Sequence, residues 1–81
     1  MDIDKVTLKA LGADTRQEIL KSLMRRRKMP SELSKVLGLS PSTIVEHLKQ
    51  LELAELVQRK ETGHKWIYYE ITSKGANIIE P

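Results

Sequence analysis

The sequence contains no cysteine, and this absence excludes disulfides, zinc ribbons and metal sensing through thiolates. No apolar run approaches the ~20 residues that a bilayer-spanning helix needs, and the first residues lack a signal-peptide pattern. Glycine and proline are sparse, with four and three residues, and we find no linker, repeat or low-complexity segment. These features lead us to expect one domain spanning residues 1–81 in a cytoplasmic protein.

The residue patterns that support catalysis are also missing. No glycine-rich phosphate loop is present, no nucleophile and base are spaced as a pair, and no acidic or histidine cluster has metal-ligand spacing. A chain of 81 residues has room for one modest core and no deep substrate cleft. We therefore expect a protein that is not an enzyme, with no cofactor and no bound metal.

Charge shows a mild basic excess. The formal net charge is +3 and the isoelectric point is near 9.3, values compatible with nucleic-acid binding. The cations form two groups, residues 25–28 and the set Arg59, Lys60, His64 and Lys65. The first group follows a predicted helix, where cations complement the helix dipole or form a solvated surface.

The first part of the chain predicts two helices. Residues 4–11 favour a helix that Gly12 ends, with three apolar side chains on one face: Val6, Ala10 and Leu11. Asp14, with Gln17 three residues later, predicts an N-cap with its capping-box partner and the start of a second helix. The buried face of that helix should consist of Ile19, Leu20 and Leu23.

A second pair of helices is predicted on either side of a very short turn. Pro30 suits the first turn of the third helix, whose buried stripe should be Leu33, Val36 and Leu37. Gly38 suits the left-handed conformation that ends a helix, with Leu39 folding back onto it. Ser40 and Pro41 predict the start of a fourth helix. That helix should run to about Ala54 and bury Ile44, Leu48 and Leu51.

After the fourth helix the apolar spacing changes to alternation. Residues 56–60 and 65–71 predict two strands, joined by residues 61–64 with Gly63 supplying the turn conformation. One face of the second strand should carry Ile67, Tyr69 and Ile71, and the other Trp66, Tyr68 and Glu70. Thr72 and Ser73 predict the cap of a last helix through Ile79.

These elements predict an α+β fold that is mostly α. Two helices joined by a glycine-containing turn, the second polar on its outer face, form a helix-turn-helix over about residues 31–54. The basic hairpin that follows, about residues 56–71, is a wing. The expected architecture is a winged helix-turn-helix, in which helices are followed by a two-stranded β-hairpin wing and a C-terminal helix.

Three stretches of the sequence resemble the ArsR-type winged helix-turn-helix transcriptional regulators: LKALGADTRQEILKSL (8–23), SELSKVLGLSPSTIVEHLKQLELAELVQRK (31–60) and GHKWIYYEITSKG (63–75). MarR-type regulators share much of this pattern. The resemblance implies a repressor that binds double-stranded DNA, with the fourth helix in the major groove and the wing near the backbone. It also implies a homodimer formed by the first and last helices.

The sequence departs from the family pattern at two places. Metal-sensing members carry a cysteine-containing motif in the third helix, where this chain has residues 30–34 (PSELS), and residues 73–80 lack the histidine of a second sensing site. A non-metal-sensing member is therefore expected. The recognition helix usually ends in glycine, but Glu55 stands there. Because a left-handed conformation would cost about 1 kcal/mol, we expect the helix to end differently.

Placing the apolar stripe of the fourth helix inward identifies the residues that would face DNA. We expect base contacts from Ser42, Val45 and Glu46, with Pro41 and Thr43 beside them. Phosphate contacts are expected from Lys49, Gln50, Arg59, Lys60 and Lys65, and His64 should reach the minor groove or a phosphate.

Several of these residues have simpler interpretations. Ser42 could satisfy amides at the helix start, and Glu46 could be a solvated residue. His47 lies at the edge of the buried stripe and is expected to be a packed, hydrogen-bonded histidine rather than a ligand. Trp66 and Tyr68 either cover the sheet or contact the DNA backbone.

One alternative function also stays open, which is a winged helix that contacts another protein. The acidic residues Glu46, Glu52 and Glu55 on or near the fourth helix support it, whereas the basic wing supports DNA. Dimerisation has independent support from apolar residues that a small monomer would not readily bury: Val6, Leu8, Leu11, Ile78 and Ile79.

Overall fold

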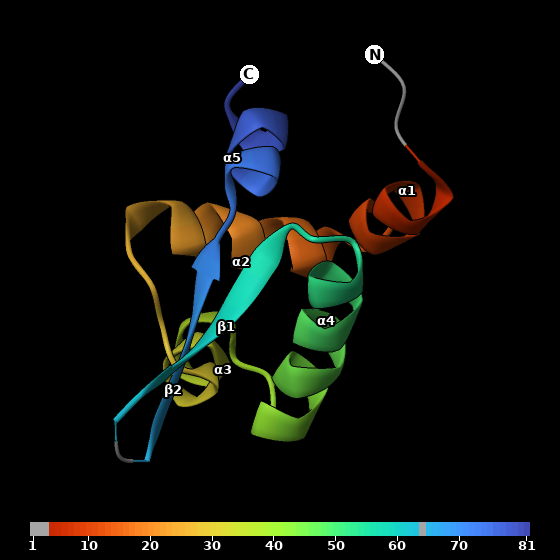
Figure 1. Ribbon diagram of the computed structural model, residues 1–81. Helices are drawn as coiled ribbons and strands as arrows, with labels where there is room; N and C mark the ends of the chain where they lie inside the picture. The colour runs from red at the N-terminus through yellow and green to blue at the C-terminus, as the bar shows by residue number, and fades with distance from the viewer. Residues whose placement is uncertain (1–3, 64) are drawn as a thin grey trace.

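The computed structural model describes residues 4–63 and 65–81, which form five helices and one antiparallel hairpin (Figure 1). In chain order the elements are α1 (Lys5–Leu11), α2 (Asp14–Arg25), α3 (Pro30–Leu37), α4 (Pro41–Leu53), β1 (Val57–Thr62), β2 (Trp66–Ile71) and α5 (Ser73–Ile79). This order confirms the predicted winged helix-turn-helix fold. None of the helices in residues 4–63 and 65–81 is long and apolar enough to cross a membrane.

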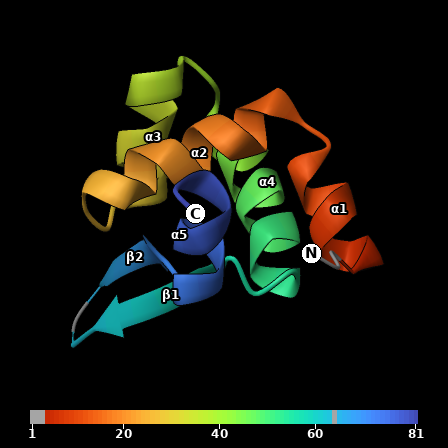
Figure 2. The same cartoon turned by 90° about the horizontal axis from the view of Figure 1, so that it is seen from above.

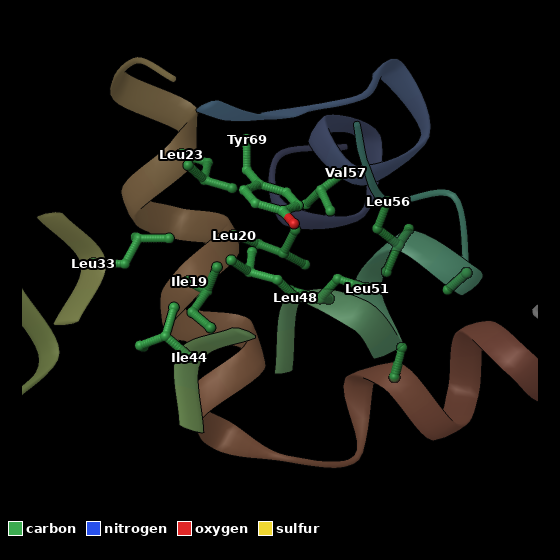
Figure 3. Packing of buried hydrophobic residues seen from close by; sticks show 12 residues of the cluster. Ile19, Leu20, Leu23, Leu33, Ile44, Leu48, Leu51, Leu56, Val57 and Tyr69 are labelled. Carbon is green, nitrogen blue, oxygen red and sulfur yellow. The ribbon is translucent and has the colours of Figure 1, made fainter. Parts of the chain in front are cut away.

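The core lies where α2 and α4 face each other beneath the hairpin (Figure 3). The predicted stripes of both helices are buried: Ile19, Leu20 and Leu23 on α2, and Ile44, Leu48 and Leu51 on α4. Leu33 of α3 closes one side, and the Tyr69 ring covers the other beside Val57. Truncating one of these large side chains to alanine typically costs about 2–5 kcal/mol, so this contact contributes strongly to the stability of the fold.

The start of the chain differs from the prediction in which residues it buries. Thr7 and Ala10 of α1 are buried, whereas Val6 is 51% exposed. The α2 cap is also different, because Ala13 is the N-cap without a side-chain bond and Asp14 is the first helical residue. Gln17 does not complete a capping box. Its Nε2 donates to the Leu11 carbonyl at 2.8 Å, so it connects α2 to the end of α1.

The turn between α3 and α4 follows the prediction closely. Gly38 has φ of 68°, and Leu39 donates its N–H to the Ser34 carbonyl at 3.2 Å and packs against the core. The predicted burial of Val36 is wrong, since that side chain is 62% exposed. α3 has only eight residues, and Leu33 with half-buried Leu37 already covers the side of α3 that meets the core.

The end of α4 contradicts the expectation drawn from Glu55. Glu55 adopts φ of 61°, so it has the left-handed conformation that glycine usually has at the end of a helix. The Leu56 N–H donates to the Leu51 carbonyl and the Glu55 N–H to the Glu52 carbonyl, both at 2.9 Å, which is a Schellman arrangement. Burial of Leu56 and a 2.7 Å bond from Thr72 Oγ1 to the Glu55 carbonyl hold the strained residue in place.

The hairpin is longer at its tip than predicted. Glu61 and Thr62 belong to β1 instead of the turn, and the register runs from Val57 opposite Ile71 to Thr62 opposite Trp66. Lys65 lies in the turn and not in a strand, and Gly63 has the expected positive φ. Ile67, Tyr69 and Ile71 share the face toward the core, as predicted.

Replacing Glu55 by glycine should stabilise the protein by about 0.5–1 kcal/mol. Glycine adopts the left-handed conformation without the Cβ clash. The free energy gained in this way exceeds the additional conformational entropy that glycine loses on folding. Urea unfolding would measure the change. Glu52→Gly, three residues earlier inside the helix, is the matched control and should destabilise by about 1 kcal/mol. A lower stability of Glu55→Gly would contradict the assigned conformation.

Candidate nucleic-acid interface

The amino end of α4 is built by local capping. Ser40 is the N-cap, and its Oγ accepts from the Thr43 N–H at 3.2 Å. Pro41 follows as the first helical residue, where its missing N–H leaves no donor unsatisfied. This end of α4 lies in the lower part of the molecule, as does the tip of the hairpin, whereas α1 and α5 lie in the upper part (Figure 1). Viewed from above, α5 projects over α2 and the hairpin (Figure 2).

α4 presents most of its predicted site residues to solvent. Five of them are exposed and two are half-buried at the flanks: Pro41, Ser42, Thr43, Glu46 and Lys49, then Val45 and Gln50. A shallow hollow of about 420 Å³ brings Ser42, Thr43, Glu46 and Gln50 together. The serine and threonine hydroxyls form a small network, with Ser42 Oγ 3.2 Å from Ser40 Oγ. This face is therefore polar and exposed along the helix.

The basic residues of the hairpin do not form one patch. Arg59 lies on the face of β1 that includes Val57 and opposes Tyr69, whereas Lys60 lies on the other face opposite Tyr68. Each has an acidic neighbour, Glu61 at 3.5 Å from Arg59 and Glu70 at 3.7 Å from Lys60. Lys65 is exposed in the turn, and His64 lies outside the described residues.

These ion pairs are weak enough to exchange partners. On α4, Lys49 Nζ similarly lies 4.0 Å from Glu46. All three pairs are solvent-exposed, and exposed pairs typically contribute about 0–1 kcal/mol. A polyanion could therefore replace the carboxylates at little cost.

His47 lies on α4 beside the polar face and is half-buried. Its Nδ1 accepts from Arg16 Nε at 3.1 Å, as expected for a packed, hydrogen-bonded histidine. Burial lowers the pKa of His47, the Arg16 charge lowers it further, and Glu46 raises it. Across residues 4–63 and 65–81 no group of three His, Cys, Asp or Glu side chains is arranged to hold a metal ion.

The sequence reasoning missed the role of the first basic group. Lys28 is only 7% exposed, and its Nζ donates to the Ser22 carbonyl at 2.6 Å. Burial lowers its pKa. Its backbone also pairs with Tyr69 through two bonds, at 3.0 and 2.8 Å, which attaches the α2–α3 connection to the edge of β2. Nothing in a run of four cations distinguishes the one that is buried.

Other members of that group are also engaged within the fold. Arg26 pairs with Glu32, which raises the pKa of Arg26 and lowers that of Glu32. The guanidinium of Arg27 lies 4.4 Å from the centre of the Tyr68 ring, a cation–π contact. The interpretation as a solvated surface is therefore wrong for Lys28 and incomplete for its neighbours. Tyr68 is half-buried beneath Arg27, while Trp66 is 55% exposed.

Comparison with known proteins points to one family. The sequence model of the family described as bacterial regulatory protein, arsR family, matches residues 13–59. HlyU from Vibrio cholerae N16961 has a similar structure, with a TM-score of 0.82 and 30% identity over 93% of this chain and 82% of its own. An ArsR-like transcriptional regulator from Rhodococcus sp. RHA1 has a TM-score of 0.82 and 32% identity, over 90% and 66% of the two chains.

A more distant structure shares the fold alone. The adhesin competence repressor AdcR from Streptococcus pyogenes has a TM-score of 0.79 at 23% identity, over 89% of this chain and 57% of its own. Among curated protein sequences, none matches the chain.

Ser40 and Ser42 should differ in their effect on stability. Ser40→Ala removes the side chain that caps α4 and should lower the free energy of unfolding by about 1 kcal/mol. Ser42→Ala removes a hydroxyl from the exposed face and should change it by less than about 0.5 kcal/mol. Urea unfolding of both variants measures the difference. Equal losses would mean that Ser42 also contributes to the cap.

Proposed function

Because the chain belongs to the arsR family of bacterial regulatory proteins, we propose that it is a transcriptional repressor that binds specific double-stranded DNA sequences. Residues 1–81 would act as a single domain, without catalysis and without a sensing metal. The observation that carries this proposal is the exposed polar face of α4, which begins at the same end of the molecule as the tip of the hairpin. A helix followed by a hairpin in this arrangement suits a major groove with its flanking backbone.

Within this proposal the residues divide by the kind of contact. Ser42, Val45 and Glu46, at the amino end of α4, would meet base edges, with Pro41 and Thr43 beside them. Val45 suits a thymine methyl group, and Glu46 suits the amino group of cytosine. A second set would bind phosphates and position the domain without reading sequence: Lys49, Gln50, Arg59, Lys60, His64 and Lys65.

We further propose that two chains form a symmetric dimer through α1 and α5. Leu8 and Val6 are 62% and 51% exposed on α1, a large apolar surface for a helix of seven residues. On the last helix Ile78 and Ile79 are half-buried, as is Leu11 at the end of α1. A dimer built from this end leaves both copies of α4 free, and two-fold symmetry would match palindromic half-sites.

A second candidate, a winged helix that contacts another protein, is favoured by exposed Leu53 and Trp66. These side chains are 69% and 55% exposed, and Glu46, Glu52 and Glu55 surround the outer side of α4. The two candidates differ in one simple measurement. A protein-contact module would not shift any duplex in a gel at low salt.

Selection from a random duplex pool tests binding and specificity together. We expect recovery of a preferred sequence, with log affinity falling linearly with log salt by about 0.9 for each phosphate neutralised.

Two variants separate phosphate contacts from base contacts. Lys65→Gln should weaken binding to all duplexes alike and reduce the salt slope by about 0.9. Glu46→Gln should change the preferred base, an effect of about 1–3 kcal/mol.

Lys21→Gln is the control for the lost charge, because Lys21 is exposed on α2, which is proposed to contact neither DNA nor the partner copy. It should leave both the affinity and the salt slope unchanged. Recovery of no duplex at low salt would reject DNA binding.

Leu8→Glu tests the dimer. Sedimentation of the unchanged protein at micromolar concentration should show a dimer, and the variant should sediment as a monomer because a carboxylate would be buried at the interface. Val36→Glu is the matched control, since Val36 is equally exposed at 62% but lies on α3. It should leave the dimer intact. A monomeric unchanged protein would contradict the proposal.

A further inference from the structure

Arg16, at the start of α2, connects three helices through one guanidinium. Its Nη1 donates to the Lys9 carbonyl near the end of α1 at 3.0 Å, and its Nε donates to His47 Nδ1 on α4 at 3.1 Å. The residues joined are 7 and 31 positions from Arg16. We call this pair of bonds the Arg16 link. It connects the helix proposed to form the dimer with the helix proposed to enter the major groove.

The link depends on the protonation state of His47. Arginine has only donors, so the nitrogen that it meets must carry a lone pair. His47 is therefore neutral with an unprotonated Nδ1 when the link is closed. Two charged groups act on the imidazole, the Arg16 guanidinium from α2 and the Glu46 carboxylate from α4. On the α1 side, the Lys9 carbonyl accepts from the same guanidinium.

The link also lies at the edge of the polar face of α4. Arg16 and His47 line the same 420 Å³ hollow as Ser42, Thr43, Glu46 and Gln50. Arg16 itself is half-buried, with both of these nitrogens already bonded to the protein. Its geometry suits holding α4 in place better than reaching a phosphate.

We propose that Arg16 is a positioning residue for DNA recognition, which holds α4 against α1 through neutral His47, so that protonation of His47 opens the link and weakens DNA binding. When Nδ1 gains a proton, two cationic groups face each other where a hydrogen bond had been, and the guanidinium must move away. α4 then loses the attachment that Arg16 makes to α1 near the amino half of α4, while Lys74 still bonds to Asp4 and to the Ala54 carbonyl at its other end. The inference rests on the proposed function.

The direction of the pH effect separates this inference from simple electrostatics. An added positive charge beside the DNA face would by itself strengthen binding to phosphates. If the link matters more, affinity must fall as His47 becomes protonated. The sign of the effect therefore decides between the two.

The experiment measures affinity for the best duplex recovered from the random pool, from about pH 7.5 to about pH 5, on either side of the ordinary histidine pKa near 6.5. The chain has two histidines, so His64→Gln is placed in every protein to leave His47 as the only one that titrates. His47→Asn keeps an acceptor near the Nδ1 position that never titrates, whereas His47→Leu removes the acceptor. Far-ultraviolet circular dichroism at each pH confirms that each protein is folded.

We expect the affinity of the parent protein to fall about three- to tenfold between about pH 7.5 and about pH 5. This change corresponds to a His47 pKa that is lower by about half to one in the DNA complex than in the free protein. His47→Asn should bind within about threefold of the parent at about pH 7.5 and show a flat pH profile. His47→Leu should bind about tenfold more weakly at about pH 7.5, also with a flat profile. An affinity that rises on acidification, or a sloping profile in His47→Asn, would overturn the inference.

Arg16→Lys supplies a second test, because one ammonium group cannot reproduce the two-armed fork. Arg25→Lys, at an exposed position of the same helix, is its matched control and should bind as the parent does. Arg16→Lys should weaken binding about three- to tenfold at about pH 7.5 and flatten the pH profile. Equal affinities and profiles of the two variants would contradict the link.

A measurement without DNA keeps this inference separate from the proposed function. NMR titration of the free parent protein should show His47 titrating below the ordinary histidine range, with Nδ1 unprotonated at neutral pH. In Arg16→Lys the pKa should move upward. If no duplex binds but these signals appear, the link stands and DNA binding fails; if His47 titrates identically in both proteins, the link itself fails.

Discussion

The structure depends on one packing contact, the apolar stripe of α4 against that of α2. Ile44, Leu48 and Leu51 are completely buried opposite Ile19 and Leu20. Because a helix has only one such stripe, burying it determines which residues remain on the outside. The polar face proposed to enter DNA is the remainder of that helix, and the hairpin takes its place from Leu56 and Val57, which continue the same core.

Polar contacts between elements add to the arrangement that core packing gives the helices and the hairpin. The Gln17 and Arg16 side chains both donate to carbonyls at the end of α1, and Arg16 also reaches His47 on α4. Lys28 attaches the α2–α3 connection to the edge of β2. A core this small buries little surface, so directional bonds at its rim contribute a larger share of the stability. The geometry of the proposed DNA face is therefore a joint product of the core and these few bonds.

Charge in this protein has two separate uses. Arg26, Arg27 and Lys28 are engaged with Glu32, Tyr68 and the Ser22 carbonyl, so they support the fold. Arg59, Lys60 and Lys49 form ion pairs with exposed carboxylates, which a polyanion could displace. The net charge alone does not distinguish these sets, and only the second is available to a ligand without disturbing the structure.

The sequence by itself determined the order of the elements, the buried stripes of α2 and α4, the Gly38 turn and the Ser40 cap, because each depends on residues only a few positions apart. It also determined which α4 side chains face outward, since the stripe leaves no other choice. Contacts distant in sequence needed the tertiary structure. Only the structure shows that Val36 and Val6 are exposed and that Lys28 is buried. It also shows Gln17 bonded to the end of α1, Glu55 held in the left-handed conformation by Thr72, and Arg16 bonded to His47. For Gln17, Glu55, Lys28 and Arg16 the partner comes from another element, and local spacing carries no information about it.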